Sequence, residues 1–340
     1  MIKENYNLQE LSTFNIGGPA QYYAEVETQQ QLIEAVKYAK QNSLNITVLG
    51  SASNVIISDE GIKGLVIRLA NTNIEQTENT LTAGAGLIWD DFVKYSVKLG
   101  LYGIENLSLI PGTVGASAVQ NIGAYGQEVA ETIKTVYALD KKTMQFVELS
   151  NKECEFAYRK SIFNSTEKGR YIIYKISYQL NDNGEFSLGY QDMAYFRDDV
   201  NLSLDKIRSE IIKIRTNKLP DYNVLPNVGS FFKNLVLEKS EFTNLVEKAK
   251  DIDAKKAEKL KSFETSRDTV KVPTALLIDL CGLKGYKAEN IGIYEKHALI
   301  VINHSKKGTC QDVLDFTKFV QNSIYDKLGV MIYPEPTVIN

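Results

Sequence analysis

The sequence predicts an α+β protein of two or three packed units. Its 340 residues exceed the usual size of a single domain. Helix and strand patterns follow one another along the chain without an internal repeat or a low-complexity tract. The turn at residues 49–57 lacks the three spaced glycines of the dinucleotide-binding fingerprint, which disfavours the doubly wound folds that carry this pattern.

Residues 1–70 are predicted to form a first unit with one helix and several short strands. The helix runs from Thr28 to Leu44, because Thr28 and Gln31 form a capping-box pattern before a one-sided apolar stripe. Short apolar runs bounded by Gly, Ser, Asn or Asp predict strands at 21–26, 46–49, 55–58 and 65–69.

Residues 71–220 are predicted to form a second unit, which ends at Pro220. A helix is expected at 87–99, where Gly100 closes it, and another at 203–217, where an apolar stripe stops before the proline. A strand is expected near 81–83. Alternating apolar and polar residues predict further strands, each with one covered face, at 132–139, 145–149 and 171–180.

Residues 221–329 are predicted to form a third unit of mixed helices and strands. Strands are expected at 229–237 and 298–303, and helices at 240–250, at 309–328 and from Pro273 to Cys281, with Gly282 behind the last. The charged stretch 251–261 is expected to be a solvated face. Residues 330–333 are a last strand candidate, within a C-terminal segment, 330–340, that can join the first unit.

Composition limits the classes of function. Apolar residues make up 44% and charged residues 24%, as in ordinary soluble globular proteins, and the formal charge of -3 provides no basic field for non-specific nucleic-acid binding. The N-terminus lacks a secretory apolar core and no later apolar run reaches membrane-spanning length, so we expect a cytoplasmic protein. The three cysteines form no metal motif with His297 or His304, and we expect buried, inert thiols and no metal site.

Two segments rich in small residues are candidates for a ligand cradle. The first, Gly50-Ser51-Ala52-Ser53-Asn54, joins two predicted strands and leaves backbone amides and hydroxyls open to a diphosphate. A tight strand-to-strand turn is the alternative interpretation. The second segment, 109–126, has no helical or strand periodicity, which suits a wall where the backbone approaches a flat ligand. Its alternative is a glycine-rich structural loop.

These two segments resemble the FAD-binding loops of the vanillyl-alcohol-oxidase/PCMH-type flavoprotein superfamily. Residues 11–18 (LSTFNIGG), 157–163 (AYRKSIF) and 228–234 (VGSFFKN) resemble successive signatures of the UDP-N-acetylenolpyruvoylglucosamine reductase family, in the same order. Residues 188–192 (LGYQD) resemble the tyrosine loop of its longer, type I form. The resemblance implies a PCMH-type FAD-binding fold of two α+β subdomains, 1–70 and 71–220, with a C-terminal α+β substrate-binding domain, 221–329.

The resemblance also implies a reaction and its participants. NADPH reduces non-covalently bound FAD, which then reduces UDP-N-acetylglucosamine enolpyruvate to UDP-N-acetylmuramate in peptidoglycan synthesis. A monomer is expected, with no nucleic-acid or membrane partner. Relatives commonly have glycine at the position of Ala52 and serine at that of Ala116. Both substitutions keep the side chain small and leave the backbone donors unchanged.

The residue roles carry over at the matching positions. Ser230 is the implied proton donor, Arg159 stabilises the substrate carboxylate, and Glu335, when protonated, donates a hydrogen bond to it. A structural serine and a surface salt bridge between Arg159 and Glu335 are the alternatives. The implied substrate residues are Tyr190, Lys218 and Asn234.

The implied cofactor contacts all lie in the two small-residue segments, apart from one arginine for which a surface helix position is the alternative. They are Gly50, Ser51, Ala52, Ser53, Asn54, Pro111, Gly112, Val114, Gly115, Ala116, Ser117, Gln120, Asn121, Gly123, Ala124, Tyr125 and Arg215.

Two other functions compete with this interpretation. An FAD-dependent oxidase of small alcohols or sugars would use the same cofactor loops, but it needs no acid such as Ser230 to protonate a carbon. Such oxidases often attach the flavin through histidine or cysteine, and neither occurs in the two segments. A non-catalytic nucleotide-binding protein would keep the cradle, yet the sequence retains each implied catalytic residue type.

Overall fold

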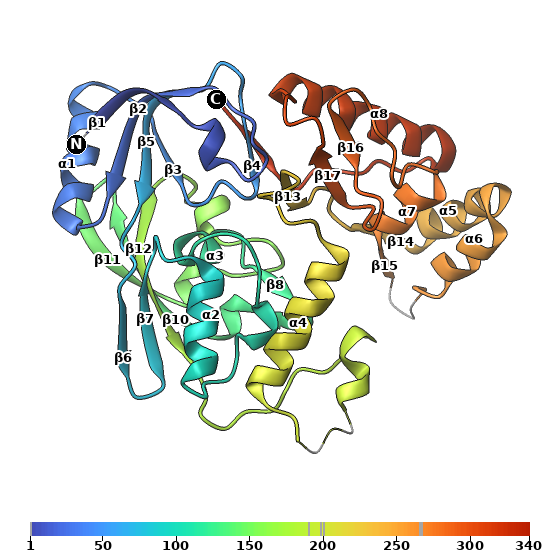
Figure 1. Cartoon of the computed structure of the whole chain (residues 1–340), viewed down its shortest axis with the longest axis horizontal. Helices are drawn as coiled ribbons and strands as arrows, with labels where there is room; N and C mark the ends of the chain where they lie inside the picture. The colour runs from blue at the N-terminus through green and yellow to red at the C-terminus, as the bar shows by residue number, and fades with distance from the viewer. Residues whose placement is uncertain (1, 190, 198, 200, 265–267) are drawn as a thin grey trace. The chain divides into compact units, whose positions relative to one another are not determined.

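The computed structural model describes residues 2–189, 191–197, 199, 201–264 and 268–340 (Figure 1). The chain divides into two compact units. The first comprises the residues up to Tyr6, Ala20–Ser51 and Ile62–Asn217, and the second comprises Asn7–Pro19, Ala52–Gly61 and Lys218–Asn340. The assignment of residues 1–70, 71–220 and 221–329 to two cofactor subdomains and a substrate domain stays a prediction.

A four-stranded sheet of order β1-β2-β5-β3 lies in the first unit beside helix α1 (Figure 1). Strand β5 pairs in parallel with both β2 and β3. Thr28 caps α1 in the predicted capping box with Gln31. The elements are β1 (Ile2–Asn7), β2 (Pro19–Val26), α1 (Gln29–Gln41), β3 (Ile46–Leu49) and β5 (Ile62–Leu69).

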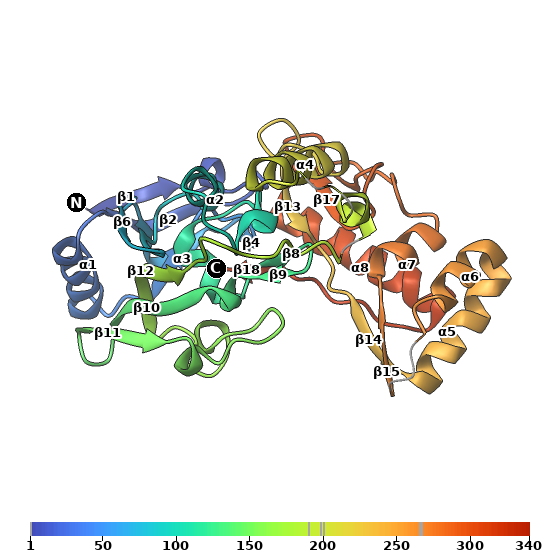
Figure 2. The same ribbon diagram turned by 90° about the horizontal axis from the view of Figure 1, so that it is seen from below.

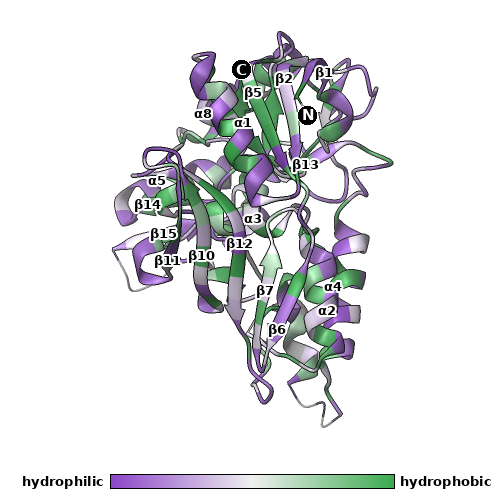
Figure 3. Cartoon of the chain, turned by 90° about the vertical axis from the view of Figure 1, so that its left-hand side faces the viewer, coloured by the Kyte–Doolittle hydropathy of each residue, from purple (hydrophilic) through white to green (hydrophobic). Residues whose placement is uncertain are grey.

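A five-stranded antiparallel sheet of order β11-β10-β12-β7-β6 forms the rest of the first unit's framework. In Figure 3, β7, β10 and β12 change between apolar and polar colours along their length, as the alternation in the sequence predicts. Trp89, Phe92 and Tyr178, the last in β12, pack together in the core of this unit. The elements are β6 (Ile74–Thr77), β7 (Thr80–Gly84), α2 (Trp89–Lys98), α3 (Val114–Val119), β10 (Ile133–Asp140), β11 (Gln145–Ser150), β12 (Tyr171–Gln179) and α4 (Leu204–Lys218).

The second unit is built from small sheets and helices that pack around one core. Strands β13, β17 and β16 form one sheet, β14 pairs with β15 beside α5 (Figure 2), and β18 pairs in parallel with β4. The elements are β4 (Val55–Ile57), β13 (Asn227–Ser230), β14 (Leu235–Glu238), α5 (Lys239–Ile252), α6 (Ala254–Lys261), β15 (Thr269–Val272), α7 (Thr274–Leu280), β16 (Ile291–Ile293), β17 (Ile300–Asn303), α8 (Cys310–Leu328) and β18 (Thr337–Ile339).

Short elements complete the chain at turns and loop ends. They are the 3-10 helices η1 (Gln9–Leu11), η2 (Glu105–Leu107), η3 (Val129–Glu131), η4 (Lys152–Cys154), η5 (Ile162–Asn164) and η6 (Gln191–Phe196), and the strands β8 (Gly123–Ala124) and β9 (Gln127–Glu128).

Four sequence-based expectations need correction. The strand predicted at 229–237 is two strands in different sheets, β13 and β14, because the chain leaves the first ladder after Ser230. The last strand is β18 at 337–339 rather than 330–333. The stretch 251–261 is not only a solvated face, because α6 buries Ala257 and Leu260. Pro273 caps α7 instead of lying inside it.

Strands β1 and β6, both at sheet edges, were not predicted, and neither were β8, β9, β15 and β16. Strands β1 and β6 are mostly exposed, so they lack the apolar alternation that identifies a half-buried strand. The three cysteines are buried and unpaired, as expected. Over the described part of the chain, no helix combines the length and apolar character needed to cross a membrane.

Candidate cofactor site and active site

The two small-residue segments approach each other at Gly50 in the first unit. Gly50 follows β3, and a Cβ atom there would lie 2.7 Å from Thr113 Oγ1 and 3.4 Å from the Ala116 Cβ. The first distance is shorter than van der Waals contact allows, so only glycine fits while Thr113 stays in place. The missing side chain therefore lets the backbone of the first segment reach the second.

Ser51 carries a buried hydroxyl for which the structure provides no partner. Its Oγ is one of four buried side-chain atoms without a hydrogen bond among the described residues. A buried hydroxyl without a partner is costly, so a water, an ion or a ligand is expected to supply the missing hydrogen bond. The next residues of the segment, Ala52, Ser53 and Asn54, belong to the second unit, where Ala52 is buried with a positive φ of 46°.

The second segment is attached by its backbone to the start of α2 and to β7. The Trp89 N–H donates to the Gly112 carbonyl at 3.1 Å, and the Gly115 N–H donates to the Ala85 carbonyl at 2.9 Å. A Cβ at Gly115 would lie 2.7 Å from that of Ala85, so this close contact requires glycine. Gly112 has a φ of 127°, a conformation that favours glycine.

Several side chains of the second segment are already engaged inside the protein. The Ser117 hydroxyl is buried and donates to the Val114 carbonyl at 2.7 Å. The Asn121 amide is buried and donates to Glu128 at 2.8 Å and to the Ala157 carbonyl at 3.1 Å. These two predicted cofactor residues therefore hold the loop in shape.

The other predicted contacts in this segment differ in burial. Val114 and Gly115 are buried. The half-buried ones are Pro111, Gly112, Ala116, Gln120, Gly123, Ala124 and Tyr125.

Arg159 lies against the second segment. Its guanidinium donates to the Asn121 carbonyl at 3.2 Å and to the Gly123 carbonyl at 3.0 Å. Its own backbone has a φ of 53°, which is sterically unfavourable for arginine. The structure thus joins a predicted catalytic residue to the predicted cofactor loop, a contact that the sequence did not indicate.

Ser230 and Glu335 lie on neighbouring backbone segments of the second unit. The Glu335 N–H donates to the Phe231 carbonyl at 2.8 Å, and Phe232 bridges Pro334. Ser230 is exposed, whereas both phenylalanines are fully buried in the core. The two rings therefore fill the core and do not shield the Ser230 hydroxyl from water.

The backbone before Ser230 carries an irregularity that aims this residue. The pairing of β13 with β17 shifts register between Asn227 and Ser230, and Gly229 has a φ of 73°. The Asn227 side chain accepts a hydrogen bond from the Gly229 N–H at 3.0 Å. Irregularities of this kind re-aim a side chain at the end of a strand.

The remaining predicted residues lie in three places. Arg215 is on α4 in the first unit, and its Nε atom is buried without a partner among the described residues. Burial lowers the pKa of the Arg215 guanidinium, and interactions with Tyr125 and Asp90 partly offset this lowering. Lys218 is the last residue of α4 and is exposed. Asn234 accepts a hydrogen bond from the Thr274 N–H at 3.2 Å. Tyr190 lies outside the described residues.

Sequence reasoning missed a buried polar network below the second segment. The fully buried Asn106 donates to the carbonyls of Tyr125 and Ser187, each at 2.8 Å, and Gln127 donates to Glu105 at 2.7 Å. The sequence shows only that the polar residues of this network flank a small-residue segment; they are Glu105, Asn106 and Gln127. No periodicity distinguishes such residues from exposed ones.

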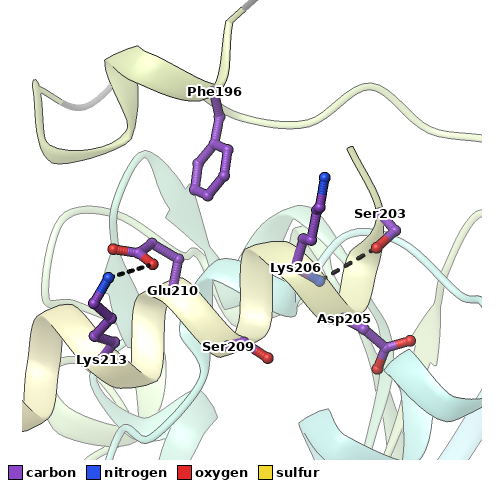
Figure 4. Close-up of a pocket in the computed structure, with 7 residues that line it drawn as sticks. All are labelled: Phe196, Ser203, Asp205, Lys206, Ser209, Glu210 and Lys213. Atoms are coloured by element: carbon purple, nitrogen blue, oxygen red, sulfur yellow. Dashed lines mark hydrogen bonds and ion pairs between the residues drawn. The ribbon is translucent and has the colours of Figure 1, made fainter. Parts of the chain in front are cut away.

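A surface cavity of about 460 Å³ lies on α4 but contains none of the predicted site residues (Figure 4). Phe196 projects toward the helix, and the charges below it are balanced, since Glu210 pairs with Lys213 at 3.3 Å. Two lysines, one aspartate and one glutamate line it. This cavity therefore offers no net charge for an anionic cofactor. Within the described residues there is no cluster of metal-ligating side chains.

Comparisons with known proteins match both halves of the chain. Residues 20–144 match a family described as an FAD binding domain, and residues 220–339 match one described as the C-terminal domain of UDP-N-acetylenolpyruvoylglucosamine reductase.

Relatives with that reductase name match over the full length. The one from Bdellovibrio bacteriovorus is 35% identical over 98% of both chains, and the one from Polynucleobacter asymbioticus is 36% identical over 99% of this chain and 96% of its own. The crystal structure of the reductase from Thermus caldophilus covers 100% of both chains at a TM-score of 0.71 and 22% identity. This likeness confirms the predicted α+β fold.

Proposed function

Because the chain belongs to the UDP-N-acetylenolpyruvoylglucosamine reductase family, we propose that it reduces UDP-N-acetylglucosamine enolpyruvate to UDP-N-acetylmuramate. FAD is its cofactor and NADPH its reductant, and the product enters peptidoglycan synthesis. The observation that carries this proposal is the 35% identity with a reductase over 98% of both chains. A monomeric state and a cytoplasmic location belong to the same proposal.

The residues of the first unit fit a dinucleotide cofactor. The buried Ser51 hydroxyl and the buried Nε of Arg215 both lack partners within the described chain, and both can donate a hydrogen bond to a diphosphate. The glycine at position 50 leaves the backbone open where a side chain would collide with Thr113. These features would hold the FAD diphosphate.

When bound, FAD would supply the hydride chemistry between NADPH and the CH₂ carbon of the enolpyruvyl group. The protein stabilises the negative charge that then spreads into the substrate carboxylate. Arg159 suits this task because its fork of N–H donors is charged and already held by the carbonyls of Asn121 and Gly123. Glu335, in its protonated form, donates a further hydrogen bond to the carboxylate.

Ser230 supplies the proton that completes the reaction. The hydride adds to one carbon of the double bond, and the Ser230 hydroxyl donates its proton to the neighbouring carbon, so NADPH and one proton are consumed for each alkene. A serine hydroxyl is a weak acid, but the carbanion-like acceptor is a strong base. The exposed position of Ser230 leaves its hydroxyl open to the substrate and to reprotonation by water.

The substrate residues suit a nucleotide diphosphate sugar. Lys218 is exposed at the end of α4 and can pair with diphosphate oxygens. Asn234 is anchored by the Thr274 N–H, which fixes the orientation of its amide. Tyr190 is proposed from the sequence alone.

An anaerobic two-step absorbance experiment tests the proposed function. The purified chain should be yellow, NADPH should bleach the flavin band, and the enolpyruvyl sugar nucleotide should restore it. UDP-N-acetylglucosamine, which lacks the alkene, is the control and should restore nothing. A colourless preparation that takes up no FAD would contradict the proposal.

The variant Ser230→Ala separates the two half-reactions. Removing the proton donor should slow flavin reoxidation by the alkene by about 100-fold or more, because a positioned acid contributes at least this much. Flavin reduction by NADPH should stay unchanged. Ser240→Ala, an exposed serine of α5 in the same unit, is the matched control. A parallel loss in both half-reactions would make Ser230 structural.

A further inference from the structure

Asp90 connects three parts of the first unit through one carboxylate. It lies in the first turn of α2 and accepts hydrogen bonds from two nitrogens of Arg208 in α4, at 2.7 and 2.8 Å. It also accepts the backbone N–H of Leu109. The helices α2 and α4 lie side by side (Figures 1 and 3). The side chains of Arg208 and Asp90 are 10% and 24% exposed, so this ion pair is stronger than a surface pair.

The contact with Leu109 holds a strained backbone at the entrance to the second small-residue segment. Leu109 has a φ of 59°, an unfavourable conformation for leucine, and its side chain is exposed. Burial of the leucine side chain therefore cannot explain the conformation. Together with the bond from Trp89 to Gly112, Asp90 fixes both ends of the turn that leads into this segment.

The contact with Arg208 fixes the rotation of α4. Arg208 and Arg215 are seven residues apart, which is about two helical turns, so they project from the same face. The Nε of Arg215 is buried and has no acceptor within the described residues, and the Asp90 charge acts on this guanidinium. A buried guanidinium whose donors are not all used is suited to an anion.

We propose that Asp90 is a positioning residue for FAD. Its carboxylate holds the second segment and the Arg215 face of α4 in the arrangement that binds the cofactor diphosphate. This inference rests on the proposed function, since it assigns FAD as the occupant. Asp90 does not itself touch the anion, because two carboxylate oxygens would repel a diphosphate. Its effect passes through Leu109 and Arg208.

The test compares two aspartates that make similar contacts. The Asp140 carboxylate accepts hydrogen bonds from the Arg170 guanidinium at 2.7 Å and from the Lys142 N–H at 2.8 Å. Asp140 lies at the end of β10, and these partners belong neither to the two small-residue segments nor to α4. FAD is titrated into the flavin-free full chain of wild type, Asp90→Asn and Asp140→Asn, and flavin fluorescence reports binding. Thermal unfolding without FAD measures the loss of stability in each variant.

Asp90→Asn should weaken FAD binding by about tenfold, which corresponds to the loss of one charge-assisted hydrogen bond. Asp140→Asn should lower stability to a similar degree but leave FAD affinity within about twofold of wild type. If Asp90→Asn does not fold, Arg208→Lys replaces it in the titration. Lysine keeps the positive charge but cannot bind the carboxylate through two nitrogens. The FAD affinity of this variant should fall several-fold.

Two outcomes overturn the inference. Wild-type affinity in both Asp90→Asn and Arg208→Lys would show that the ion pair does not position the site. Equal weakening in Asp90→Asn and Asp140→Asn would show a general effect of lost stability. Failure of the wild-type chain to bind FAD would instead count against the proposed function itself.

Discussion

Ala52 adopts a left-handed backbone conformation, with a φ of 46°, in the first small-residue segment. The Cβ of an L-residue is strained there by about 1–2 kcal/mol, whereas glycine is not. Glycine would therefore match the backbone at this position better than the alanine of this chain. Ala52 is also buried, so its methyl group contributes some packing that glycine would lose.

These opposing effects predict that Ala52→Gly changes the free energy of unfolding by less than about 0.5 kcal/mol, because relief of strain offsets lost packing and added chain entropy. Ala39→Gly in α1 is the matched control, since Ala39 is also buried but helical. It should cost at least about 1 kcal/mol. Urea unfolding measures both values, and an equal loss in the two variants would contradict the strain argument.

Side-chain partners limit what can be predicted at single residues. The small size of Ser117 and its place in the segment were evident in the sequence, but its hydroxyl binds the Val114 carbonyl instead of facing a ligand. Asp90 resembled an ordinary acidic residue in the first turn of a helix, where such residues are common. Its partner Arg208 is 118 positions away, so no local pattern could reveal the pair.

At the scale of elements, strand β13 presents Ser230 through an irregular backbone. Gly229 has a φ of 73°, and a Cβ added there would meet no atom within 4 Å. A side chain would therefore fit in space but strain the backbone by about 1–2 kcal/mol. The strain can relax only by moving the neighbouring residues, and Ser230 is the next one.

Gly229→Ala should slow flavin reoxidation by the alkene by about tenfold or more, because it would displace Ser230, the proposed proton donor, from its alignment. Flavin reduction by NADPH should remain close to wild type. Gly282→Ala is a close control, because Gly282 after α7 has a φ of 75° and equally open surroundings. Stopped-flow absorbance separates the two half-reactions, and an equal effect of both variants would show only a stability loss.

Elements with strong local signals were predicted well. The capping box at Thr28 identified α1 within a few residues, and the apolar stripe within 309–328 identified α8. The segment 229–237 was misread as one strand, because the break between β13 and β14 depends on their different strand partners. Pairing partners are long-range properties, which local periodicity does not contain.

At the scale of the whole molecule, unit membership depends on contacts between distant segments. Residues 7–19 and 52–61 join the second unit because β18 pairs with β4 and the Asn303 side chain donates to the Phe14 carbonyl. The sequence indicated that a C-terminal strand can join an early segment but not how the units divide. The reaction, in contrast, could be inferred early, because it depended on motifs spread in order along the full chain.

Acid should destabilise the molecule partly through two aspartates that are paired with arginines, Asp90 and Asp140. Burial raises the pKa of Asp90, but hydrogen bonds from Arg208 and the Leu109 N–H outweigh this effect and lower the pKa overall. A hydrogen bond from Arg170 is the main cause that lowers the pKa of Asp140. A carboxyl whose pKa is lowered by folding binds fewer protons in the folded state. Its contribution to stability is therefore present above the unfolded pKa of about 3.9 and is lost as pH falls through the folded pKa.

Wild type should accordingly be more stable than Asp90→Asn at about pH 7, and the difference should shrink as the pH falls below about 4, because asparagine does not titrate. The same narrowing is expected for Asp140→Asn. Urea unfolding of all three chains across this range, at constant ionic strength, measures the difference at each pH. A difference that stays constant down to about pH 3 would mean that the charge of Asp90 does not stabilise the fold, and that the variant acts only through altered hydrogen-bond geometry.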